Sequence, residues 1–107
     1  MAHGTHDYDI DPRNVDIIIG INDDLLPREK AMVSVFDSGF MLGDGVWEGI
    51  RVHGGKLAFL GDHLRRLYEG AMGIDMDIGR SPGELTAMIQ ATLDANDMGD
   101  ADGVHIR

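Results

Sequence analysis

The segment LGDGVWEGIR, residues 42–51, places an aromatic ring, a carboxylate and a guanidinium on one short extended run. Alternate residues of a β-strand share a face, so Trp47, Gly49 and Arg51 are expected to point the same way. Trp47 and Arg51 would lie roughly 13 Å apart, at about 3.3 Å per residue. A glycine inside a strand often marks the close approach of a ligand. The pattern therefore suits a small molecule with an apolar part and an anionic part.

A purely structural role explains the same segment as well, with Trp47 in the core and Arg51 in water. Glu48 falls on the opposite face, together with Val46 and Ile50. A carboxylate among aliphatic side chains needs a partner, because an isolated buried charge is very costly. We therefore expect Glu48 either to pair with an arginine or to lie in water at a strand end.

Arg66 is a second candidate for ligand binding, in the sequence HLRRL of residues 63–67. Apolar residues at helical spacing predict an amphipathic helix over 62–73, with its stripe centred near Leu64 and Ala71. At about 100° per residue, Arg66 points almost opposite to this stripe. It would stand in solvent in an isolated domain, whereas a docked second domain would turn it toward a cleft. There its planar fork would suit a phosphate. The sequence has no glycine-rich phosphate loop of the Walker or Rossmann type.

Strands are predicted on both sides of these residues. The β-branched run at 15–21, followed by NDD, predicts a hairpin, and Pro27 predicts the end of its pairing. The alternating run at 31–37 predicts a further strand, and the glycine-rich stretch after it predicts a loop or a single helical turn. Residues 46–53 predict a strand that turns at Gly54-Gly55 and pairs with 56–60.

Two helices and a last strand complete the predicted order. Asp62 is the expected N-cap of the first helix and Gly73 its stop. Ser81, Pro82 and Glu84 predict the start of the second helix through a capping box. Its apolar stripe consists of Leu85, Met88, Ile89 and Leu93, and it is expected to fray near 96–103. The sequence GVHIR then begins a strand. The fold class is α+β, an antiparallel sheet covered by two helices.

The composition narrows the function classes. Nineteen acidic and nine basic residues give the 107-residue chain a net charge of −10, which disfavours nucleic acid and anionic membranes as partners. Cysteine is absent, so neither a disulfide framework nor a thiolate metal site is expected, and the cytoplasm is the expected location. Residues 1–14 are expected to form a flexible arm, in which the pair His3 and His6 is not expected to bind a metal.

The motifs together resemble the amino-terminal domain of the class IV aminotransferases, the fold-type-IV pyridoxal phosphate enzymes. The resemblance rests on Gly39, on Gly43-Asp44-Gly45, on the Trp47-Glu48 pair, on the glycine turn and on His63 to Leu67. It covers nearly all of residues 15–107 in order and spacing. It implies a small domain with the fold of the D-amino-acid and branched-chain aminotransferases.

The resemblance also implies roles for individual residues. Arg66 would hold the phosphate of pyridoxal 5'-phosphate, and Trp47 would line the pocket for the substrate side chain. Arg51, His105 and Arg107 hold substrate-binding slots that resemble the branched-chain group, and Leu42 holds a further substrate-binding slot. The substrates would be an amino acid and a 2-oxo acid. The resemblance also implies a homodimer.

Two departures leave the substrate open. The branched-chain enzymes usually carry a tyrosine where this chain has Leu42, and a phenylalanine where it has Trp47. The missing hydroxyl removes a hydrogen bond from the pocket, and the larger indole narrows it.

The catalytic lysine that such enzymes require is not matched by either lysine of the sequence, Lys30 or Lys56. The resemblance implies that this lysine lies in a second domain beyond Arg107. The chain also stops in the middle of a predicted strand, so we expect it to be the front part of a longer protein. No catalytic residue is therefore assigned to these 107 residues, which are not expected to be active alone. The alternatives are a lyase similar to aminodeoxychorismate lyase and a non-catalytic binding or assembly module.

Overall fold

The computed structural model describes residues 11–107. The expectations for His3, His6 and the first ten residues of the arm lie outside that range. At the end of the expected arm, a 3-10 turn, η1 (Pro12–Asn14), follows Asp11, whose side chain caps it. Arg13 donates to the carbonyl oxygens of Asp102, at 2.9 Å, and Gly103, at 3.4 Å, which ties this turn to the start of the last strand.

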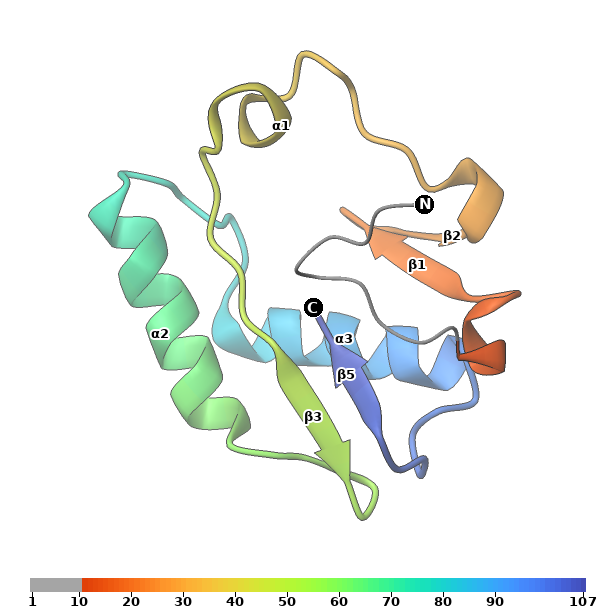
Figure 1. The fold of residues 1–107 in the computed structure, drawn as a ribbon. Helices are drawn as coiled ribbons and strands as arrows, with labels where there is room; N and C mark the ends of the chain where they lie inside the picture. Colours follow the sequence, from red (N-terminus) through yellow and green to blue (C-terminus); the bar gives the residue numbers. More distant parts are fainter. Residues whose placement is uncertain (1–10) are drawn as a thin grey trace, which may run out of the picture.

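The architecture is α+β, as predicted, with two small antiparallel sheets (Figure 1). One sheet pairs β1 (Ile18–Ile21) with β2 (Asp24–Pro27), and the other has the order β4-β3-β5. The strands of the second sheet are β3 (Ile50–His53), β4 (Lys56–Leu57) and β5 (Val104–Ile106). The helices are α1 (Ser38–Leu42), α2 (Leu60–Gly73) and α3 (Pro82–Ala95), with a 3-10 turn η2 (Arg28–Lys30) after β2. Within residues 11–107, none of the helices has the length and apolar character needed to cross a membrane.

Both predicted hairpins form. The turn at Asn22 and Asp23 joins β1 to β2, and pairing ends at Pro27, which has no amide hydrogen to donate. Gly54 and Gly55 join β3 to β4 with φ angles of 57° and 74°, in the left-handed region that glycine enters without strain. The partner strand covers two residues rather than the five expected.

The core lies between the three-stranded sheet and α3, which runs behind β3 and β5 in Figure 1. Its centre is formed by Val52, Leu93 and Val104, from β3, α3 and β5 in turn. Partly buried side chains pack around them: Leu57, Ile89, Met98, Ala101 and Ile106. On α2 the predicted stripe centre is confirmed, because Leu64 and Ala71 are buried.

The start of α3 matches the sequence prediction in every detail. The Ser81 hydroxyl accepts from the Glu84 amide at 3.1 Å, and the Glu84 carboxylate accepts from the Ser81 amide at 3.3 Å. Pro82 occupies the first helical position, where its missing amide hydrogen costs nothing.

The expected N-cap of α2 was wrong. The helix begins two residues before Asp62, after Phe59, whose φ of 54° reverses the chain without a side-chain cap. Asp62 instead lies in the first turn, where a carboxylate still favours the helix dipole.

The strand predicted over 31–37 was also wrong. No strand partner runs beside this stretch, and its apolar side chains at Met32, Val33, Val35 and Phe36 are exposed. Alternation stabilises a strand only when one face is buried against neighbours. The strand predicted over 46–53 is real only from Ile50 onward, since residues 43–49 form neither a helix nor a paired strand.

Candidate functional site

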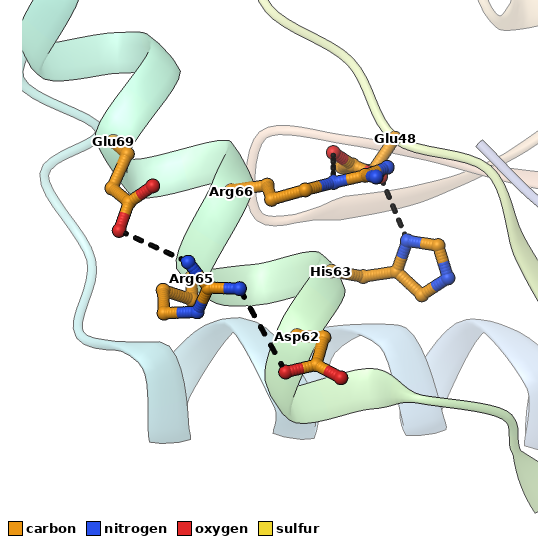
Figure 2. A network of polar contacts seen from close by, with 6 residues as sticks. All are labelled: Glu48, Asp62, His63, Arg65, Arg66 and Glu69. Carbon is orange, nitrogen blue, oxygen red and sulfur yellow. Dashed lines mark hydrogen bonds and ion pairs between the residues drawn. The ribbon is translucent and has the colours of Figure 1, made fainter.

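The polar cluster drawn in Figure 2 has the Glu48 carboxylate at its centre. Oε1 accepts from Nε of Arg66 at 3.0 Å, and Oε2 accepts from a terminal nitrogen of the same guanidinium at 2.6 Å. Oε2 also lies 2.7 Å from Nδ1 of His63. The Glu48 side chain is only 13% exposed, whereas that of Arg66 is 61% exposed. One shielded carboxylate therefore holds two cationic or polar side chains at the protein surface.

Local structure explains why these three side chains meet. Residues three apart on a helix are neighbours on one face, so His63 and Arg66 of α2 extend side by side. The segment before β3 runs beside α2, because a Cβ added at Gly70 would lie 3.4 Å from a methyl of Val46. This packing of Val46 against α2 at Gly70 brings Glu48 to the helix. Sequence analysis left Glu48 with either an arginine or water as its partner, and the arginine is the outcome.

The charges in the cluster reinforce one another. The hydrogen bonds from Arg66, and then those from His63, lower the pKa of Glu48 from 4.5 to about 2. The Glu48 carboxylate in turn raises the pKa of Arg66 above its ordinary value. Both groups are therefore ionised at neutral pH. A guanidinium has five N–H donors, and Glu48 engages two of them, so three remain for another oxygen ligand.

Arg65 provides a comparison within the same helix. It is 60% exposed, and among residues 11–107 it interacts with carboxylates of its own helix, Glu69 at 3.3 Å and Asp62 at 3.9 Å. Such exposed pairs one turn apart hold a side chain weakly. Figure 2 shows Arg65 turned along its own helix, while Arg66 extends to the segment before β3. Of these two adjacent arginines, only Arg66 is fixed by a shielded carboxylate.

Trp47 and Arg51 are both exposed, as expected for the face that their spacing predicted, although Trp47 lies outside β3. Ile50 and Val52 point into the core, and Arg51 between them is exposed on the opposite side of the sheet. The Trp47 ring is 77% exposed, and a Cβ added at Gly49 would lie 3.8 Å from it. The indole therefore lies over the glycine, on the side away from the core. The structural alternative, with Trp47 packed in the core, does not hold.

The other predicted site residues lie on two further elements. His105 is the register partner of Arg51, so these two side chains share the exposed face of β3 and β5. His105 and Arg107 also line a cavity of about 660 Å³, together with Arg13 and Arg28 from the amino-terminal elements. Leu42 ends α1 and is exposed, and the segment 43–49 separates α1 from β3 (Figure 1). Within residues 11–107 the predicted residues thus form neighbouring groups rather than one closed pocket.

His63 is the member of the cluster to which sequence analysis gave no partner. Its signal was its position three residues before Arg66, which places both side chains on one helix face. The contact with Glu48 spans fifteen residues of chain and follows only from the packing of α2 against the segment before β3.

A cationic group of this kind fits the phosphate of a cofactor. Arg66 is fixed in place, remains exposed and keeps donors free, and phosphate oxygens prefer a planar arginine fork. Nothing among residues 11–107 gathers three potential metal-ligating side chains of the His, Cys, Asp or Glu type.

No protein-family model matches the chain. Relatives with curated names do match it. Over 96 residues it is 42% identical to "Branched-chain-amino-acid aminotransferase-like protein 1" of Arabidopsis thaliana, an alignment that covers 90% of this chain and 17% of the plant protein. Over 78 residues it is 37% identical to the "D-alanine aminotransferase" of Listeria monocytogenes, covering 73% of this chain and 27% of the relative. The Bacillus licheniformis "D-alanine aminotransferase" is 37% identical over 75 residues, 70% of this chain and 26% of that protein.

Proposed function

We propose that this chain is the amino-terminal domain of a pyridoxal-phosphate-dependent transaminase of class IV. The proposal rests on its homology to a segment of the aminotransferases. The enzyme transfers an amino group between an amino acid and a 2-oxo acid. The observation that carries the proposal is Arg66, an exposed guanidinium held by a shielded carboxylate within a chain of aminotransferase relatives. This chain would supply the wall that binds the cofactor phosphate and the substrate.

The residues would divide this work by their chemistry. Arg66 binds the phosphate through the donors that Glu48 leaves free. Trp47 presents an exposed ring to the apolar part of a substrate, and Arg51 with His105 presents polar groups to its carboxylate. Leu42 and Arg107 are assigned to the same substrate wall. Pyridoxal 5'-phosphate, when bound, supplies the carbonyl group and the electron-accepting ring of the reaction.

The complete active site needs more chain than these residues. The chain spans 17 to 27% of the length of the relatives named above. Lys30 ends η2 and Lys56 begins β4, and neither matches the position of the catalytic lysine. We assign that lysine to a second domain, and we propose a homodimer. The acidic, cysteine-free composition supports the cytoplasm as the location.

Branched-chain amino acids are the favoured amino donors, on the basis of the plant relative and of Arg51, His105 and Arg107. D-amino acids are the second candidate, because D-alanine aminotransferases match a similar stretch of the chain. Transamination assays with L-leucine and D-alanine as donors separate the two. Release of pyruvate without amino transfer would instead identify a lyase.

Replacing Arg66 by alanine tests the proposal, with Arg65→Ala as the matched control. The two arginines are adjacent on α2 and equally exposed, so both variants lose one surface charge. We expect Arg66→Ala in the full-length protein to weaken pyridoxal 5'-phosphate binding on the order of tenfold to a hundredfold, as for lost charge-assisted hydrogen bonds. Arg65→Ala should change it less than about twofold. The measurement is titration of the visible absorbance of the bound cofactor. Equal affinities for both variants would remove Arg66 from the phosphate role.

A further inference from the structure

We propose that Glu48 is a positioning residue: it orients the free donors of Arg66 toward the bound phosphate and fixes His63 as the tautomer that carries its proton on Nδ1. The inference rests on the proposed function for the role of Arg66. It goes beyond that function because it assigns work to a carboxylate and a histidine that need not touch substrate or cofactor.

Glu48 holds the Arg66 guanidinium through two hydrogen bonds. An arginine side chain that is 61% exposed would otherwise sample many rotamers. Glu48 accepts from Nε and from one terminal nitrogen, at 3.0 and 2.6 Å, and this paired geometry defines the guanidinium plane as well as its place. The other terminal nitrogen then points away from Glu48, along the side that a phosphate can reach. Preorganisation of this kind raises affinity because less freedom is lost on binding.

Glu48 also contacts His63 on the same face of α2. An ionised carboxylate can only accept hydrogen bonds, and its Oε2 lies 2.7 Å from Nδ1 of His63. Nδ1 must therefore carry a proton. In the neutral ring this leaves Nε2 as a bare acceptor, which distinguishes His63 from a histidine free to exchange between tautomers. The arrangement also limits Glu48, because its Oε2 is held from two sides.

Both contacts of Glu48 depend on an ionised carboxylate. Its pKa of about 2 keeps the carboxylate charged throughout the pH range in which an aminotransferase is assayed. The two contacts are therefore present together under those conditions. A neutral partner in its place would be a weaker acceptor for both side chains.

Glu48→Gln and Glu48→Asp test the assignment in the full-length protein, with Glu69→Gln as the control. Glu69 is an exposed carboxylate on the same helix that pairs with Arg65. Glutamine keeps the shape of Glu48, but its amide group must present a donor toward Arg66 in either orientation, and toward His63 as well when it replaces Oε2. We expect Glu48→Gln to weaken pyridoxal 5'-phosphate binding by about tenfold, by analogy with the loss of residues that orient the ligands of a bound metal. Glu48→Asp should recover part of this loss, and Glu69→Gln should bind the cofactor like the unmodified protein.

A nitrogen NMR measurement on histidine-labelled protein gives a readout that a merely structural role would not move. Without cofactor, His63 should show its proton on Nδ1 in the unmodified protein and in Glu69→Gln. In Glu48→Gln it should shift toward the Nε2-protonated tautomer or average between the two. A neutral His63 ring that carries its proton on Nε2 and none on Nδ1 in the unmodified protein would overturn the proposal even where every variant failed to fold.

The two proposals fail in different ways. Unchanged cofactor affinity in Arg66→Ala would refute the phosphate role of Arg66, whatever Glu48 does. A loss in Arg66→Ala combined with an unchanged Glu48→Gln would leave the proposed function intact and refute the positioning role alone.

Discussion

Asn96 joins two parts of the fold that are far apart in sequence, and its removal should loosen them selectively. Its Oδ1 accepts from the Ile18 amide at 2.7 Å, and its Nδ2 donates to the Ile18 carbonyl oxygen at 2.9 Å and the Thr92 carbonyl oxygen at 2.8 Å. These bonds attach the first residue of β1 to the end of α3. Asn96→Ala removes all three and leaves the half-buried amide of Ile18 without its acceptor.

The expected cost follows from these contacts. Each neutral hydrogen bond contributes about 1 kcal/mol net, and an amide left without a partner costs a similar amount or more. We therefore expect Asn96→Ala to lower the free energy of unfolding by about 2 to 4 kcal/mol. The exposed Gln90, whose side chain donates to Asp94 on its own helix, provides the control. Gln90→Ala should change stability by less than about 0.5 kcal/mol.

Two measurements check this prediction. Urea denaturation gives the change in the free energy of unfolding. Hydrogen exchange at the Ile18 amide reports the local effect, and opening that is easier by 2 to 4 kcal/mol means exchange faster by about thirtyfold to several hundredfold. Exchange at Ile18 as slow in Asn96→Ala as in the unmodified protein would refute the reasoning, because the contact would then not hold β1 in place.

Two further outcomes concern the site itself. Trp47→Phe should change the preference among amino donors by about tenfold while cofactor affinity stays constant, because the exposed ring lies over Gly49 and makes none of the hydrogen bonds that hold Arg66. KM values for donors of different side-chain size measure this change, and a loss confined to cofactor binding would contradict it. The lowered pKa of Glu48 means that its contribution to stability is fully present above about pH 4.5 and is lost as the pH falls toward about 2. Acid unfolding followed by circular dichroism should therefore show a flatter curve for Glu48→Gln in this range, and parallel curves would speak against the ion pair.

Local signals in the sequence predicted much of the fold. The capping box at Ser81 and Glu84 and the turn at Gly54-Gly55 each depend on residues within four positions, so the sequence contains the whole cause. The buried face of α2, at Leu64 and Ala71, followed from helical spacing in the same way.

Features that depend on distant partners could not be predicted so well. The stretch at 31–37 has the alternation of a strand but lacks a neighbouring strand to pair with. The region around Asn96 was expected to fray, yet its contact with Ile18 spans seventy-eight residues. In the candidate site, the spacing placed Trp47 and Arg51 on one face, but only the packing of α2 selected Arg66 and His63 as partners of Glu48.

The chain has a net charge of −10, so the hydrogen-bond geometry around Arg66 matters for any binding of a phosphate. A phosphate approaching this surface is repelled at long range, but exposed charges more than about 8 Å apart are largely screened at physiological ionic strength. Affinity for the anion must then come from contacts at hydrogen-bond distance. Glu48 cancels the formal charge of Arg66, yet it leaves three N–H donors free and holds them in a defined orientation. If Arg66 binds a phosphate as proposed, orientation of the arginine by Glu48 must outweigh the loss of its unpaired charge.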